Sequence, residues 1–249
     1  MTELSAFAEV QAAFERGDHA DVLRRTETIL AERPGDDAAH ELRARSLLAL
    51  GRVPEAEAEA ENAVRLDPDE IRYRELLAEV LASEGAHRDA ADEYRRLAAG
   101  DPRQAEWTVA EARERLGAAQ PEMGIDAARR ALRLDPQNAT AQLALAQGLT
   151  RLGQPRSALE AALRAAALRP EDAAAQETLA DARWLAGEVG EALEDYRALA
   201  ARRSGAAREP VLQKARTLVR LRSGWLGRLV SRVPLLFELA LRNGWLRVS

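Results

Sequence analysis

The chain has 249 residues, which is enough for one long domain or two small ones. Apolar residues make up 47% and charged residues 31%, but aromatic residues only 4%. This composition favours packed helices over sheets, which are rich in β-branched and aromatic side chains. The absence of cysteine excludes a disulfide framework, a thiolate metal site and a cysteine nucleophile.

The N-terminal stretch, residues 1–18, carries acidic residues and lacks the basic start and apolar core of a signal peptide. We therefore expect a cytoplasmic protein.

Residues recur along the chain with a period of 34. One column is proline, at Pro34, Pro68, Pro102, Pro136 and Pro170. Half a period earlier lies a column of glycine with one exception: Gly17, Gly51, Gly85, Ala119, Gly153 and Gly187. Two further columns hold small residues, namely Val10, Ala44, Ala78, Ala112, Ala146 and Ala180, and Val22, Ala56, Ala90, Gly124, Ala158 and Ala192.

Each column has a physical interpretation. Proline cannot continue a helix, so it closes the second helix of each unit. Glycine supplies the left-handed backbone conformation that ends the first helix and opens a tight turn. Small residues in mid-helix allow two helices to approach closely. The pattern predicts a helix–turn–helix unit repeated six times over residues 3–204.

The 34-residue period, the glycine turn, the paired small residues and the Leu-Asp-Pro ends at 66–68 and 134–136 resemble the tetratricopeptide repeat (TPR) family. The resemblance implies an all-α fold, a right-handed α-solenoid of helix–turn–helix repeats with a C-terminal capping helix. The chain departs from the family pattern at Ala119-Gln120-Pro121, where a turn glycine is expected. We expect local irregularity there, with Gly117 and Gly124 as the residues that compensate for it.

In this family the first helices line a concave surface that binds partner proteins. The resemblance assigns the following residues to such a groove: Phe7, Gln11, Phe14, Glu41, Arg45, Arg72, Glu75, Glu79, Glu106, Arg113, Gln147, Arg151, Glu177, Asp181 and Trp184, with Val109 and Leu143 among them. The Lys and Asn clamp that some members use for a C-terminal carboxylate is absent. An acidic stretch (Glu41, Glu75, Glu79 and Glu106) favours a basic or amphipathic helical ligand, and the alternative is a solvated charged face.

After residue 204 the charge changes sign. Residues 1–204 hold 27 arginines against 39 acidic residues, a net charge of −12, whereas the last 45 residues hold nine basic residues against two acidic ones, a net charge of +7. Residues 205–223 predict a capping helix from Pro210 to Arg222. We expect its apolar face to cover the last repeat (Val211, Leu212, Ala215, Leu218 and Val219) and its outer face to be polar (Lys214, Arg216 and Arg220).

The final segment, residues 224–249, is basic and apolar and is predicted to be helical. Its candidate docking residues are Trp225, Leu226, Leu229, Val230, Leu236, Phe237, Trp245 and Leu246. Three locations are open: the end of the solenoid, a partner chain or second copy, and an anionic membrane surface. Arg228, Arg232, Glu238 and Arg242 exclude a membrane span, because they leave no apolar run of about 20 residues.

Residues for chemistry are scarce. The only histidines are His19, His40 and His87, and the first and last of these share one repeat slot, so repetition explains them better than a metal site. None of the common catalytic, nucleotide-binding or metal-binding motifs is present. We therefore expect no catalytic residues, metal or cofactor, and the −12 charge of the repeats disfavours nucleic acid.

The sequence thus predicts a non-catalytic scaffold or adaptor that binds a segment of a partner protein in its groove. Two alternatives remain open. The chain is a peripheral membrane tether at the inner membrane face that uses its C-terminal segment, or it is a regulatory subunit of an enzyme complex.

Overall fold

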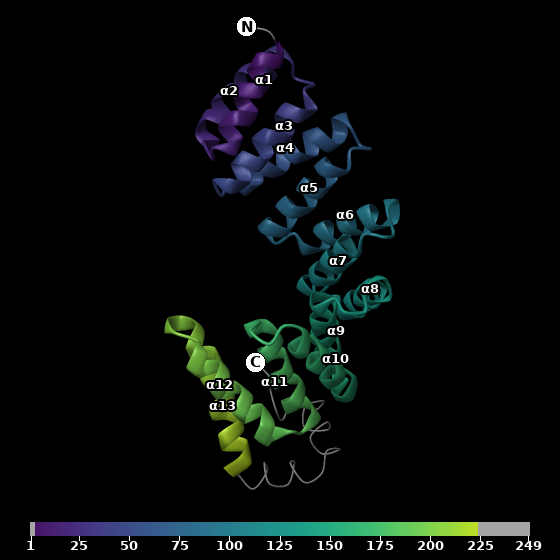
Figure 1. Ribbon diagram of the computed structural model, residues 1–249, viewed down its shortest axis with the longest axis vertical. Helices are drawn as coiled ribbons and strands as arrows, with labels where there is room; N and C mark the ends of the chain where they lie inside the picture. The colour runs from purple at the N-terminus through teal and green to yellow at the C-terminus, as the bar shows by residue number, and fades with distance from the viewer. Residues whose placement is uncertain (1–2, 224–249) are drawn as a thin grey trace. The chain divides into compact units, whose positions relative to one another are not determined.

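The computed structural model describes residues 3–223, with side chains from residue 7 to residue 219. The described residues form helices and no strand (Figure 1). The candidate docking residues from Trp225 to Leu246 lie outside them.

The chain divides into two compact units, residues 1–119 and residues 120–249. In the first unit the described helices are α1 (Glu3–Glu15), α2 (His19–Glu32), α3 (Asp37–Ala49), α4 (Val53–Leu66), α5 (Ile71–Glu84), α6 (His87–Gly100) and α7 (Ala105–Gly117). In the second they are α8 (Pro121–Leu134), α9 (Ala139–Arg151), α10 (Pro155–Leu168), α11 (Ala173–Ala186), α12 (Val189–Arg202), a short 3-10 helix (Gly205–Ala207) and α13 (Arg208–Ser223).

Within each unit, every helix packs against the next one in the chain. First helices also touch the first helix of a neighbouring pair: α1 contacts α3, α3 contacts α5, and α9 contacts α11. The small residues explain this closeness, because all six residues of the Val10–Ala180 column have no exposed surface. A larger side chain in these positions would hold the helices apart or force strain. The all-α class, the consecutive helix packing and the capping helix are confirmed.

The turns between paired helices use one backbone conformation. The glycines at 17, 51, 85, 153 and 187 have positive φ, and Ala119 adopts the same region with φ 55°. The expected irregularity at this turn was wrong, because the alanine itself takes the left-handed conformation. Gly117 does not have positive φ; instead its Cα lies against the His87 ring, where an added Cβ would come within 2.7 Å of the imidazole.

The repeat prolines are tied to the next helix through their carbonyl groups. His40 Nε2 lies 3.1 Å from the carbonyl oxygen of Pro34. Arg74 Nη2 donates to that of Pro68 at 3.1 Å, and Gln176 Nε2 to that of Pro170 at 3.0 Å. The donor always lies six residues after the proline, so a column of polar side chains fixes the crossing from one pair to the next.

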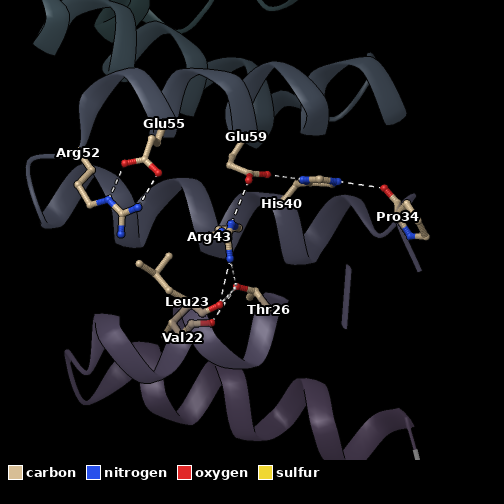
Figure 2. A network of polar contacts seen from close by, with 9 residues as sticks. All are labelled: Val22, Leu23, Thr26, Pro34, His40, Arg43, Arg52, Glu55 and Glu59. Atoms are coloured by element: carbon tan, nitrogen blue, oxygen red, sulfur yellow. Dashed lines mark hydrogen bonds and ion pairs between the residues drawn. The ribbon is translucent and has the colours of Figure 1, made fainter. Parts of the chain in front are cut away.

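A polar network joins three successive helices in the first unit (Figure 2). Arg43 of α3 donates to the Leu23 carbonyl of α2 at 3.0 Å and to Glu59 Oε1 of α4 at 3.0 Å. Glu59 also contacts His40 Nδ1 at 2.5 Å. Arg43 therefore links its own helix to the one before it and to the one after it.

The capping helix α13 begins at Arg208, so Pro210 lies within its first turn rather than at its start. Val211 and Leu218 are fully buried and Ala215 nearly so, all in one core cluster with α11 and α12. Val219 is 42% exposed and does not belong to this apolar face. Lys214 does not face outward as expected, because it forms ion pairs with α11.

Candidate functional site

The candidate residues on α1 and α3 are largely engaged within the chain. Phe14 packs against the first core cluster and meets His19 edge-on, with ring centroids 5.8 Å apart. Glu41 is only 8% exposed and accepts from Arg45 at 3.0 Å, with Arg72 of α5 at 3.8 Å from its other oxygen. The Glu41 carboxylate is therefore neutralised by two of the other predicted groove residues.

The acidic residues on α5 and α7 are less fully paired. Glu75 accepts a hydrogen bond from the Trp107 indole at 2.6 Å. Glu79 and Glu106 are exposed. Arg113 lies 3.5 Å from Glu114, which also contacts His87 Nδ1 at 2.7 Å. Burial, followed by the charges of Glu79 and Glu114, raises the pKa of Tyr94 to about 12.

In the second unit, a cavity of about 330 Å³ opens beside α9 and α11. Four predicted groove residues line it (Gln147, Arg151, Glu177 and Asp181) together with Thr150, Ala174 and Thr178. Gln147 Nε2 lies 3.5 Å from the Thr178 hydroxyl, across the gap between the two helices. The cavity therefore brings together amide, hydroxyl, guanidinium and carboxylate groups from two neighbouring first helices.

The two carboxylates of this cavity are held by cations from the end of the chain. Lys214 Nζ lies 3.0 Å from Glu177 and 2.8 Å from Asp181, and Arg203 donates to Glu177 at 2.8 Å. Burial alone would raise the pKa of Glu177, but hydrogen bonds from Lys214 and Arg203 outweigh it and hold that pKa below its usual value. Burial likewise opposes the charge of Lys214, and Asp181 with Glu177 outweighs it and raises the Lys214 pKa.

Tyr196 completes this cluster from below. Its hydroxyl donates to Asp181, and its ring lies 5.7 Å from Lys214 Nζ. Burial raises the pKa of Tyr196, and the Asp181 charge raises it further. The phenol therefore stays a neutral donor.

Two of the proposed groove residues lie in the core. Trp184 is 4% exposed and packs with Tyr196, Val211 and Leu218, so its ring is not on an open surface. Val109 is also buried. The remaining predicted residues from residue 7 onward lie on first helices as expected, but the structure gathers only the four around the α9–α11 cavity.

Lys214 was assigned to the outer face, and its contacts with Glu177 and Asp181 were missed. A sequence signal existed, since Lys214 continues the small-residue column that runs from Val10 to Ala180 and is the only lysine in the chain. A lysine in that slot indicates an internal partner.

Two structural searches concern other kinds of site. Among residues 3–223, no three histidine or acidic side chains gather where they could hold a metal ion. In the same range no helix has the length and apolar character needed to cross a membrane.

Comparison with known proteins returns one family. A model described as tetratricopeptide repeat matches residues 13–80, and a second model with the same description matches residues 143–207. No protein of the curated set matches the chain.

Solved structures share the fold at low sequence identity. A tetratricopeptide repeat protein from Parabacteroides merdae is 15% identical with a TM-score of 0.72, covering 94% of this chain and 98% of that one. MamA from Desulfovibrio magneticus RS-1, residue 41 to its end, is 21% identical with a TM-score of 0.61, covering 67% and 95%. YrrB, a TPR protein, is 15% identical with a TM-score of 0.58, covering 76% and 97%. The 34-residue columns, the packed helices and the two family matches lead to one conclusion: the chain belongs to the tetratricopeptide repeat family.

Proposed function

We propose that the protein is a non-catalytic scaffold that holds a segment of a partner protein against the first helices of its second unit. The observation that supports this proposal is the α9–α11 cavity, which is lined by four of the residues assigned to the groove from sequence. The similar structure of YrrB is described as having an unusual peptide-binding site, which agrees with this kind of ligand.

The cavity has the chemistry to recognise a peptide backbone. Because Lys214 and Arg203 already pair with Glu177 and Asp181, these acids do not demand a further cation. Gln147 and the hydroxyls of Thr150 and Thr178 offer neutral donors and acceptors beside them. Main-chain N–H and C=O groups of an extended segment match such a mixed lining.

Site-specific photo-crosslinking tests this proposal. A photoreactive side chain replaces Ala174, which is exposed and lines the cavity. The matched control replaces Ala167, which is also exposed but lies on α10. We expect the Ala174 position to capture one discrete segment, identifiable by mass spectrometry, that the Ala167 position does not capture. Equal capture at both positions, or none at Ala174, would argue against a ligand in the cavity.

A second candidate is a peripheral membrane tether at the inner membrane face. Its support is the composition of residues 224–249, which combine arginines with tryptophan and leucine as interfacial helices do. The full chain should then float with anionic liposomes, and a chain that ends at Arg222 should stay at the bottom of the gradient. Identical flotation of the two chains would rule this candidate out.

A further inference from the structure

Two places in the chain repeat one combination of side chains. Glu75 and Glu79 lie one helical turn apart on α5, followed by Tyr94 on α6. Glu177, Asp181 and Tyr196 occupy the same slots three repeats later. None of the other four repeats has an acidic residue in both slots or a tyrosine in the third.

In the second unit this combination holds a lysine. Lys214 Nζ lies 3.0 Å from Glu177 Oε1, and 2.8 and 3.0 Å from the two Asp181 oxygens. The Tyr196 ring lies 5.7 Å from the same nitrogen, within the range of a cation–π contact. An ammonium group has three donors and no acceptor, so two carboxylates and an aromatic ring suit it. The chain itself therefore demonstrates which ligand this combination accepts.

In the first unit the same combination lacks that ligand. The slot of Lys214 is taken by Ala112, which is fully buried. Glu75 accepts from the neutral Trp107 indole, and Glu79 forms no ion pair with any residue that the structure describes. Arg113 contributes one positive charge nearby, but its guanidinium contacts Glu114. Three carboxylates, those of Glu75, Glu79 and Glu114, thus surround Tyr94 with a single arginine.

We propose that Glu75, Glu79 and Tyr94 receive a lysine ammonium from a helix of a partner protein. The occupant is a lysine-bearing helix because that is the element that fills the equivalent place in the second unit, where α13 presents Lys214 between its buried residues Val211 and Leu218. Charge complementarity with the exposed Glu79 agrees with this choice. The site is on α5 and α6, separate from the α9–α11 cavity, so either proposal can fail alone.

The test uses the α13 sequence as the probe. A synthetic peptide of residues 208–223 is titrated into the full-length, ¹⁵N-labelled protein, and the indole N–H resonance of Trp107 is followed. A Trp107→Phe chain assigns that resonance. Trp107 reports on the site because its indole donates to Glu75. The buried Trp184 reports separately on any exchange of the peptide with α13 in the second unit.

We expect the peptide to shift the Trp107 resonance to saturation. Acetylation of the peptide's lysine, or Glu79→Gln in the protein, should weaken this binding roughly fivefold, the scale of one partly exposed ion pair. Glu122→Gln, at an exposed position on α8, is the matched control and should leave the affinity unchanged. An unmoved Trp107, a shift confined to Trp184, or equal binding by the acetylated peptide or by the Glu79→Gln protein would overturn the proposal.

Discussion

At the scale of single residues, position within the repeat decides whether an arginine matters. Arg43 and Arg52 lie on and just after α3, and both pair with glutamates of α4 (Figure 2). The Arg43 side chain is 21% exposed and reaches two other helices, whereas that of Arg52 is 46% exposed and pairs only with Glu55 three residues on. Contacts between exposed charges contribute little to stability.

Replacing Arg43 with Met should therefore lower the stability of α3 and its neighbours by about 1–3 kcal/mol, since Glu59 loses a partly buried partner. Arg52→Met should cost less than about 0.5 kcal/mol. Native-state hydrogen exchange of the α2, α3 and α4 amides measures both variants. Equal effects would show that Arg43 does not join the three helices.

The Lys214 cluster predicts a defined pH dependence. The pKa of Glu177 is lowered in the folded protein, so its contribution is complete above the unfolded value of 4.5 and is lost as the pH falls through the folded pKa. The pKa of Lys214 is raised, so its contribution is complete below 10.5 and is lost as the pH rises through the folded pKa. The contact is thus strongest between these two limits.

Lys214→Met should destabilise the docking of α13 by about 2 kcal/mol in this window, because two partly buried carboxylates lose their shared cation. The difference in unfolding free energy between the wild type and this variant should shrink below pH 4.5 and above pH 10.5. Arg216→Met is the control, since Arg216 and its partner Glu209 are both mostly exposed. A difference that is constant from pH 3 to pH 11 would contradict this account of the cluster.

At the scale of elements, the turn after each first helix depends on one left-handed residue. Ala119 adopts φ 55°, although a side chain makes this region unfavourable by about 1–2 kcal/mol. Glycine adopts it without that cost but loses more chain entropy on folding.

Ala119→Gly should therefore stabilise the protein by about 0.5–1 kcal/mol, and Gly153→Ala, at the equivalent turn, should destabilise it by about 1 kcal/mol. Thermal unfolding followed by circular dichroism compares the two. The opposite order of stability would mean that the backbone conformation at these turns is not what limits them.

The elements could be predicted from sequence because the repeat states them several times. Prolines at 34 and 68 and glycines at 51 and 85 mark helix ends by backbone geometry, which needs no tertiary information. Side-chain partners were harder to predict. The outward placement of Trp184 failed although Leu48 and Leu116, in the same slot, are apolar.

Lys214 shows why part of the site escaped prediction. Its contacts depend on how α13 is rotated against α12, and that rotation is set by which apolar residues of α13 enter the core. The neutralisation of Glu41 by Arg72 likewise depends on a neighbouring repeat. Periodicity identifies a face of a helix, but not which charged groups on neighbouring helices meet.

At the scale of the whole molecule, a repeat protein stabilises each helix pair mainly through its neighbours. Surface positions on first helices are therefore open to variation without loss of the fold, and binding chemistry can differ from one repeat to the next. In this chain the second unit combines a cavity with a lysine-filled acidic cluster, and the first carries the same acidic combination without the lysine.

The central claim is that a partner segment lies in the α9–α11 cavity. The most direct measurement is the affinity, by titration calorimetry, of the segment captured by crosslinking for three full-length proteins: the wild type, Ala174→Arg and Ala167→Arg. Both alanines are exposed on helices, but only Ala174 lines the cavity. We predict that Ala174→Arg, which fills the cavity, weakens binding about tenfold or more, a loss of about 1.4 kcal/mol, and that Ala167→Arg binds as the wild type does. Unchanged affinity for Ala174→Arg, or an equal loss for both variants, would contradict the account.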